Sequence, residues 1–411
     1  MKKLSRILSA AGLLGAALSV TGCNQGGKLE AIAKEDIKIG LICLHDENST
    51  YDLNFINSMK EAVKNLGLNE ETQLVIRTGI GEDATCYNTA SSMVDDGCNI
   101  VFADSFGHEA FMIKAAKAFK SVRFAHATGT KAHTEKLANY YNAFADIYQG
   151  RYLAGVAGGM KLKELMDNNQ LKDNNKDANG NVKLGYVGAF TYAEVVSGFT
   201  SWYLGVQSVV PNVVMDVTFT GSWYDPVAEK AGAEKLIQGG AALVSQHADS
   251  MGAPEACKAA GVPNVSYNGS TEATCAGSFV VGSKINWAPY YEYLVNSTIN
   301  NTKIDWDYSG TIAGGSVQLT DLGSAAAAGT ADKLAEVKAK LISGELKVYD
   351  TNKFTVKGAK LTTYQADVDD FGDYKPDTEA VKDGYFNESA YRSAPYFDIQ
   401  IDGINYLDTK F

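Results

Sequence analysis

From Ile37 onward, short apolar runs alternate with amphipathic stretches, and this order constrains the fold more than any other feature of the chain. The apolar runs are expected to be strands, at residues 37–43, 73–78, 99–103 and 121–127. The intervening stretches have apolar residues at helical spacing, and helices are expected at residues 51–66, 83–95 and 109–119. Strands and helices that alternate at this spacing form βαβ units, whose strands make a parallel sheet.

The alternation begins again after a long apolar helix expected at residues 149–165. Further strands are expected at 182–188, 213–218, 241–246, 262–267 and 277–284, with helices at 194–209, 226–238, 252–260, 289–300 and 331–341. About sixty residues at the C-terminal end contain three strand-like runs, 353–356, 360–363 and 397–402, within polar loops. The pattern predicts an α/β protein with two lobes of similar build, each a mostly parallel sheet flanked by helices.

The N-terminal residues have the pattern of a bacterial lipoprotein signal. A basic start, Met1-Lys2-Lys3, precedes an apolar run at residues 7–20, and Val20-Thr21-Gly22 precedes Cys23. The run has about 14 residues, whereas a membrane-spanning helix needs about 20, so a transmembrane anchor is the weaker interpretation. We expect residues 1–22 to be a signal peptide and Cys23 to carry the lipid. Residues 23–35 would then be a polar tether on the extracytoplasmic face of the cell membrane.

Composition indicates a soluble globular domain that does not bind nucleic acid. Hydrophobic residues make up 45% of the 411 residues and charged residues 21%, and the net charge is -11. A surface of that sign repels nucleic acid and anionic lipid headgroups. The five cysteines after Cys23 contain no CxxC pair, and we expect buried free thiols, with a Cys257–Cys275 disulfide as the alternative.

One polar segment, residues 166–181, resembles the first half of a calcium-binding loop. Asn175, Asp177, Asn179 and Gly180 match that pattern, but Tyr186 occupies the position of the bidentate glutamate. We therefore interpret it as a connecting loop and expect no metal and no cofactor.

Residues that follow the expected strands are the candidates for a ligand site, because ligands of open α/β sheets lie at the carboxyl ends of the strands. These positions are rich in aromatic and in neutral or acidic hydrogen-bonding residues and contain no arginine. Such a set suits a flat, polar, uncharged ligand that stacks on aromatic rings, such as a nucleobase, a nucleoside or some sugars. The candidate ligand-binding residues are His45, Asp46, Tyr51, Asn54, Phe55, Asp104, Phe106, Phe190, Trp223, His247, Asp249, Asn268 and Trp287.

Structural roles compete with binding at several of these positions. Asp225 precedes Pro226, so it is also a candidate helix cap, and Asp52 is another. Trp287 is also a candidate core residue. The chain has no Gly-x-Ser-x-Gly elbow, Walker loop or HExxH motif, so we do not expect an enzyme.

Several stretches resemble the basic membrane protein family, the lipid-anchored substrate-binding proteins of ABC importers. The resemblance rests on residues 37–41 with the loop 45–55, on Gly150-Arg151-Tyr152-Leu153-Ala154-Gly155-Val156, and on residues 185–190 with 195–199. It covers about residues 36–320. It implies a type I periplasmic-binding-protein fold with three hinge crossings, in which residues 36–147 and 284–345 form the N-terminal lobe and residues 148–283 and 346–411 form the C-terminal lobe. It also implies a purine nucleoside or nucleobase ligand, an ABC permease as partner and a monomeric receptor.

Two departures from the family pattern bear on ribose recognition. Where nucleoside-binding members have Asp-x-Ser-Phe-Asn, this chain has Asp52-Leu53-Asn54-Phe55-Ile56, and the ribose-binding Asp of those members is matched by Asn268. An amide accepts hydrogen bonds from hydroxyls less strongly than a carboxylate does. The runs at 223–226, 246–250 and 287–291 are closer to members that bind a free base such as adenine. A receptor of the same fold for a sugar or another small polar solute, and a membrane-tethered sensor without a transport role, remain the alternatives.

Overall fold

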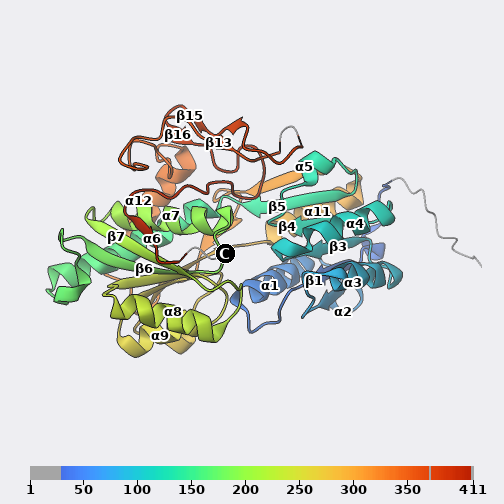
Figure 1. Cartoon of the computed structure of the whole chain (residues 1–411). Coiled ribbons are helices and arrows are strands. Elements are labelled where there is room, and N and C mark those ends of the chain that lie inside the picture. Colours follow the sequence, from blue (N-terminus) through green and yellow to red (C-terminus); the bar gives the residue numbers. More distant parts are fainter. Residues whose placement is uncertain (1–28, 370–371, 409–411) are drawn as a thin grey trace, which may run out of the picture.

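The computed structural model describes residues 29–369 and 372–408, and its strands form two large sheets (Figure 1). The expected signal peptide and Cys23 lie outside the described residues. The first sheet has the order β11-β5-β4-β3-β1-β2, and all its strands are parallel. Its strands are β1 (Ile39–Ile42), β2 (Leu74–Arg77), β3 (Ile100–Ala103), β4 (Arg123–Ala127), β5 (Tyr140–Ala145) and β11 (Asp307–Gly310). We call this sheet and its helices the N-terminal lobe.

Helices cover both faces of the first sheet. They are α1 (Thr50–Asn65), α2 (Glu70–Gln73), α3 (Ala84–Asp95), α4 (Glu109–Ala118), α5 (Ala132–Glu135) and α11 (Ala288–Asn300). Successive residues of a strand point to opposite faces, so β1 contributes Leu41 to a core shared with α1 and α11, and Ile42 to a core shared with α3 and α4. Two single-turn 3₁₀ helices, Lys34–Asp36 and Phe106–His108, complete the lobe.

The second sheet has the order β12-β10-β9-β8-β6-β7-β17 and is parallel except for β12. Its strands are β6 (Val182–Gly188), β7 (Val213–Phe219), β8 (Leu243–His247), β9 (Asn264–Tyr267), β10 (Phe279–Ile285), β12 (Val317–Leu319) and β17 (Ile404–Tyr406). Its helices are α6 (Ile147–Asp167), η3 (Asp173–Asn175), α7 (Ala193–Gln207), α8 (Pro226–Gln238), α9 (Gly252–Ala260), α10 (Glu272–Cys275) and α12 (Thr330–Ser343). We call this unit the C-terminal lobe.

The core of the C-terminal lobe depends on a close approach of two helices. Gly155 of α6 faces Gly205 of α7, and a Cβ atom on Gly155 would lie 2.1 Å from the backbone oxygen of Trp202. Glycine at both positions therefore lets the two backbones touch. The pair covers one face of the sheet, while α8 and α9 cover the other.

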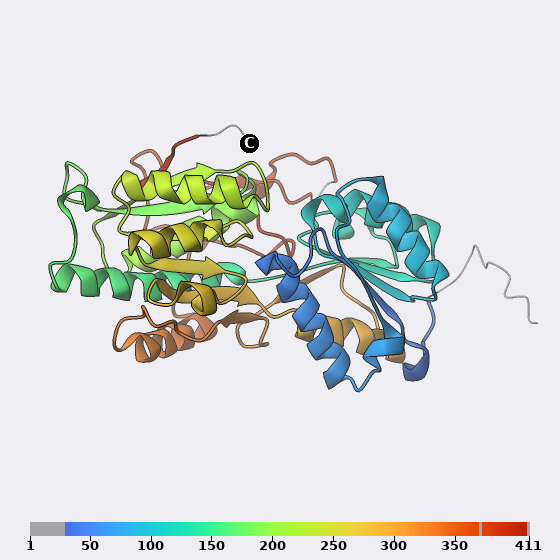
Figure 2. The same cartoon turned by 90° about the horizontal axis from the view of Figure 1, so that it is seen from below.

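Three connections join the lobes, and Figure 2 shows them between the two bodies. The chain passes from β5 into α6, from β10 into α11, and from β11 back to β12. The third passage differs from the expectation, which assigned residues 284–345 to the N-terminal lobe. β12 pairs antiparallel with β10, so it belongs to the second sheet. α12 packs on α6, so it belongs to the helices that cover that sheet.

Other parts of the secondary-structure prediction were also wrong. No strand is predicted at β5, because its apolar run leads into the long helix α6 with only Asp146 between them. The three runs expected as strands near the C-terminus form no strands, although Val356 makes one isolated bridge with Ala359. The strands there are the two-residue β13 (Gln365–Ala366), β14 (Thr378–Glu379), β15 (Val381–Lys382) and β16 (Tyr385–Phe386).

Two expectations about side chains agree with the structure. The five cysteines from Cys43 to Cys275 are buried and free. Asp177 accepts hydrogen bonds from the backbone of Asn179 and Asn181, at 2.8 Å each, so it closes its own loop. Among the described residues, no helix is both long and apolar enough to cross a bilayer.

The C-terminal segment, residues 346–408, contacts both lobes and runs across the top of the molecule (Figure 1). On the N-terminal lobe, Asp307 of β11 accepts hydrogen bonds from the backbone and hydroxyl of Ser393, at 2.9 and 2.8 Å, and lies 2.9 Å from His133 of α5. On the C-terminal lobe, β17 extends the sheet beside β7. His133 Nε2 also lies 2.7 Å from the Val368 carbonyl of this segment. The sequence assigned the segment to the C-terminal lobe alone, so its contacts with the N-terminal lobe differ from that prediction.

The Asp307→Asn variant tests the ion pair between His133 and Asp307, which lies beneath the C-terminal segment. The contact with Asp307 raises the pKa of His133, so the ion pair adds its stability fully below the usual histidine pKa and loses it as the pH rises through the raised value. We expect the free energy of unfolding to fall by about 1–3 kcal/mol at pH 6 and by less at pH 9. Chemical denaturation at both pH values measures this. Asp373→Asn, in the exposed pair with Lys375, is the control, and an equal loss at both pH values would contradict the ion pair.

Candidate ligand-binding cleft

A cavity lies between the lobes, where the carboxyl ends of strands from both sheets meet. Its empty space is about 340 Å³, counting the part open to solvent. The residues that line it are Leu44, His45, Tyr51, Asp52, Ser105, Phe106 and Thr128 from the N-terminal lobe, and Glu194, Trp223, His247 and Asp249 from the C-terminal lobe. This described lining contains three carboxylates and no lysine or arginine.

The first turn of α1 holds a carboxylate at the cavity wall. Ser49 is the N-cap of α1, and its hydroxyl accepts from the backbone of Asp52 at 3.2 Å and donates to the Asp52 carboxylate at 2.6 Å. The backbone of His45 donates to the same carboxylate at 2.8 Å. Burial alone would raise the pKa of Asp52, but the hydrogen bonds from His45 and Ser49 outweigh it and lower that pKa. Asp52 therefore presents a negative charge to the cavity.

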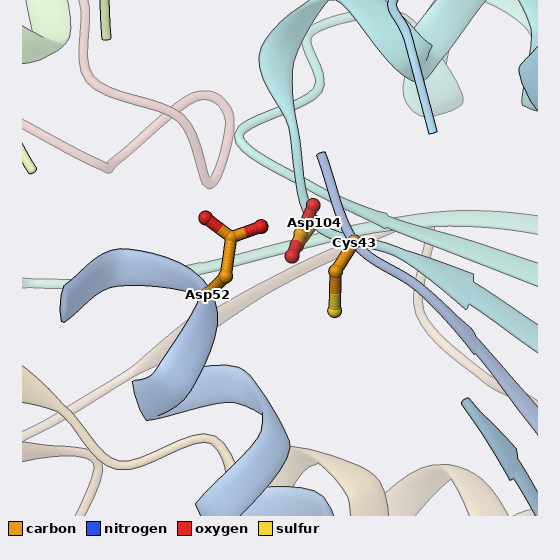
Figure 3. Close-up of side chains that lie close together, drawn as sticks. All are labelled: Cys43, Asp52 and Asp104. Carbon is orange, nitrogen blue, oxygen red and sulfur yellow. The ribbon is translucent and has the colours of Figure 1, made fainter. Parts of the chain in front are cut away.

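Asp104 lies directly behind Asp52, together with Cys43 (Figure 3). Ligand atoms of these three residues lie within 4.8 Å of one another, and all three side chains are buried. Burial, and then the charge of Asp52, raise the pKa of Asp104 well above its usual range, and burial also raises that of the Cys43 thiol. A thiol and two carboxylates can ligate a metal, and without one these shifts favour the protonated forms of Cys43 and Asp104.

The C-terminal lobe contributes polar groups at the ends of its strands. His247 ends β8, and its Nε2 atom lies 3.5 Å from Oε1 of Glu194 in the first turn of α7. Burial lowers the pKa of His247 and raises that of Asp249 well above its usual range. These side chains are buried donors and acceptors beside the cavity, able to fix the orientation of a polar ligand.

Aromatic rings from both lobes meet at the cavity. Phe106 of the N-terminal lobe stacks on Tyr192 of the C-terminal lobe, with ring centres 5.2 Å apart. Phe190 stacks on Tyr192 at 5.0 Å and contacts the edge of Trp223 at 4.9 Å. Phe106 and Trp223 themselves line the cavity, so it offers ring surfaces from both lobes.

A backbone contact closes the cleft beside these rings. The Thr50 backbone N–H at the start of α1 donates to the Asp249 carbonyl at 3.0 Å, and the Thr50 hydroxyl lies 3.2 Å from the same oxygen. One of the N–H groups that an α-helix leaves unpaired at its start is thus paired by the opposite lobe.

Comparison with known proteins identifies the family of this two-lobed chain. Residues 39–352 match the model of the Bmp family, described as ABC transporter substrate-binding protein PnrA-like. The chain belongs to this family. It is 30% identical to a purine-binding protein of Brucella abortus over 69% of this chain and 74% of that protein. A putative ABC transporter glucose-binding protein of Haloferax volcanii is 27% identical over 62% of this chain and 60% of that protein.

Solved structures of ABC solute-binding proteins share the fold of this Bmp-family chain. That of Conexibacter woesei superposes with a TM-score of 0.59 and 21% identity, over 76% of this chain and 98% of that one. That of Aeropyrum pernix has a TM-score of 0.60 and 15% identity, over 76% and 92%. The predicted type I periplasmic-binding-protein fold is confirmed. Because the family consists of substrate-binding proteins, the expectation that this chain is not an enzyme also agrees with the family.

The predicted ligand-binding residues of this Bmp-family protein divide into two groups. The cavity is lined by the predicted residues His45, Tyr51, Phe106, Trp223, His247 and Asp249. Phe190 packs against Trp223, and Asp104 lies behind Asp52. That these residues contact the ligand stays a prediction.

The remaining predicted residues lie away from the cavity wall. Phe55 and Trp287 stack on each other in the core, with ring centres 4.4 Å apart. The Asn54 amide donates to the Ile285 carbonyl at 2.7 Å, next to a connection between the lobes. Asp46 is exposed and accepts from the backbone of Asn48 within its own loop.

Asn268 also lies outside the described lining, behind Asp249. Its amide donates to Asp249 at 3.5 Å, and its φ of +67° lies in the left-handed region, which asparagine tolerates better than most residues. It therefore supports the wall instead of forming it.

Some lining residues were absent from the predicted set: Leu44, Asp52, Ser105, Thr128 and Glu194. Asp52 was interpreted as a candidate helix cap and as the first residue of the family's loop motif, yet Ser49 is the cap. Asp52 and Glu194 both lie in the first turn of a helix that follows a strand, and that position was the available signal. Asp225 is the N-cap of α8, accepting from Val227 and Ala228, as its alternative role predicted.

The Ser49→Ala variant tests whether the cap also shapes the site. Loss of the cap is expected to lower the free energy of unfolding by about 0.5–2 kcal/mol. Loss of the hydrogen bond also raises the pKa of Asp52 and frees its carboxylate to rotate, so ligand affinity should fall. Denaturant unfolding and calorimetry measure the two effects. Asn69→Ala, which removes the N-cap of α2, is the control whose affinity should not change, and unchanged affinity in Ser49→Ala would contradict the role of Asp52.

Proposed function

We propose that this Bmp-family protein is a monomeric, lipid-anchored receptor that binds a purine in the cleft between its lobes and delivers it to the permease of an ABC importer. The observation that carries the proposal is the cavity itself. Ring surfaces from both lobes border a narrow space whose described lining has three carboxylates and two imidazoles but no arginine or lysine. A phosphate or carboxylate ligand would need positive groups there, whereas a purine needs stacking surfaces and hydrogen-bond partners for its edges.

The similarity to a purine-binding protein of Brucella abortus supports this ligand class. It extends over 69% of the chain, at 30% identity. The structure favours a free base over a nucleoside, because Asn268, at the position of the ribose-binding carboxylate in the predicted pattern, supports Asp249 from behind and does not line the cavity.

A sugar is the second candidate, and one observation favours it. The relative from Haloferax volcanii is named as a putative glucose-binding protein, and three carboxylates in the lining are acceptors that hydroxyl groups can use. Sugars also stack on aromatic rings. Calorimetry with adenine, adenosine, guanosine, glucose and ribose distinguishes the candidates. Binding of a purine supports the proposal, and binding of sugars alone contradicts it.

The Trp223→Ala variant tests the stacking contact. Stacking of a base on an aromatic ring contributes about 1–3 kcal/mol, so purine affinity should fall by roughly 5- to 150-fold. The matched control is Trp306→Ala, because Trp306 is also half-buried but lies outside the cavity, with its indole donating to the Leu137 carbonyl. If both variants bind the purine as tightly as the unchanged protein, Trp223 does not stack on the ligand.

The anchoring part of the proposal rests on the N-terminal sequence, with its basic start, apolar run and Cys23. The Cys23→Ser variant removes the sulfur that would carry the lipid. We expect this variant to lose its membrane association in cell fractionation, while the released protein keeps its fold and its purine affinity. Mass spectrometry of the unchanged protein should find an acylated N-terminal cysteine. A variant that stays in the membrane fraction would contradict the anchor.

A further inference from the structure

Arg151 of α6 is a fully buried cation close behind the cavity wall. Its guanidinium donates to two uncharged oxygens, the Tyr186 hydroxyl and the Gln246 carbonyl, the latter at 3.0 Å. Its Nε and Nη1 atoms have no hydrogen-bond partner among the described residues. Burial lowers the pKa of Arg151 to about 10, so the group remains charged at neutral pH.

A buried charge without an ionic hydrogen-bond partner is costly, by several kcal/mol even after relaxation. A core position of this kind would be filled more stably by an apolar residue of similar volume. We therefore expect the buried charge to act on the residues around it. Of the residues that line the cavity, His247 is the one to consider first.

Arg151 and His247 share the same neighbours. The Arg151 Cζ atom lies 4.4 Å from the centre of the Tyr267 ring, and the His247 ring lies 4.7 Å from it. Both also face Gly198 of α7, where a Cβ atom would lie 3.1 Å from His247 Nδ1 and 3.6 Å from Arg151 Nε. Glycine at this position lets the two polar groups share one small space.

The two ring nitrogens of His247 therefore lie in different electrostatic environments. Nδ1 is buried without a hydrogen-bond partner among the described residues, and it lies next to Gly198, which the positively charged Arg151 side chain also approaches. Nε2 lies 3.5 Å from the carboxylate of Glu194, an acceptor. A neutral imidazole has one N–H and one lone pair, and this environment puts the N–H at Nε2 and the lone pair at Nδ1.

We propose that Arg151 is a positioning residue that keeps His247 neutral, with its proton on Nε2 facing the cavity and its bare Nδ1 facing the guanidinium. The inference rests on the proposed function, in that the ligand binds in this cavity. The cleft then presents one fixed donor, His247, beside one fixed acceptor, Glu194. This pair matches a ligand edge on which an acceptor stands beside a donor, as on the pyrimidine edge of a purine.

The charges around His247 give the pH dependence. Glu194 of α7 favours the imidazolium, while Arg151 of α6 opposes it, and burial opposes it most strongly. Tyr267 of β9 packs on the His247 ring, and Asp249 lies two residues after His247 in the sequence. The net effect lowers the pKa of His247, so purine affinity should change by less than about twofold between pH 6 and pH 8.

Nitrogen-15 NMR of the histidine side chains in the ligand-free full-length protein tests the inference. In the unchanged protein, His247 should show the neutral form with Nε2 protonated throughout pH 6–8. In Arg151→Met, burial still opposes the imidazolium but the opposing positive charge is gone, so the midpoint of the His247 titration should move to a higher pH than in the unchanged protein. Arg151→Lys keeps the charge and is the matched control, with His247 neutral. A protonated His247 or an Nδ1–H form in the unchanged protein, or an unchanged titration in Arg151→Met, would overturn the proposal.

A second variant keeps the test usable if Arg151→Met does not fold. Gly198→Ala leaves both charges in place but puts a methyl group between them, so the His247 ring must move and its NMR signals should change, with a loss of affinity of about tenfold. If the His247 signals are unaffected, the shared space has no role. The NMR result does not depend on the identity of the ligand. A failure to bind purines would refute the proposed function, whereas an unexpected state of His247 refutes this inference alone.

Discussion

The parallel order of the strands is the constraint on which the rest of this structure depends. In each lobe the helices return the chain to the same edge, so all the residues that follow a parallel strand lie at one end of the sheet. Three connections turn these two ends toward each other. The cavity therefore collects its lining from segments far apart in sequence, from Leu44 to Asp249. Neither lobe alone would enclose it.

At the closed cleft the two lobes contact each other directly, and the buried charge of Arg151 lies behind the cavity wall. Thr50 pairs with the Asp249 carbonyl, and Phe106 stacks on Tyr192, so the lobes touch directly at the cavity. A ligand held by both lobes would add to these contacts and shift the population toward closure. The C-terminal segment, which extends beyond the matched family region, joins the lobes away from the cavity.

Much of the fold follows from the sequence, and the failures have physical causes. The limits of β6, α8 and α9 were predicted to the residue, because Pro226 and Asp225 mark a helix start and Gly261 a helix end. The ladders near the C-terminus are only two residues long on each strand, which is too short for a period to appear in the sequence. Within the site, residue type and position after a strand found Trp223, but they did not separate it from Trp287. Both are aromatic residues at strand ends, and only the packing of Phe55 shows that Trp287 belongs to the core.

A crystal structure of the full-length protein with adenine at saturating concentration tests the central claim most directly. The account predicts density for the base inside the cavity, with one face against Trp223 and its edge within hydrogen-bond distance of His247 Nε2 and the Glu194 carboxylate. Adenine bound elsewhere on the surface, or a cavity that stays empty while a sugar soaked under the same conditions fills it, would contradict the account.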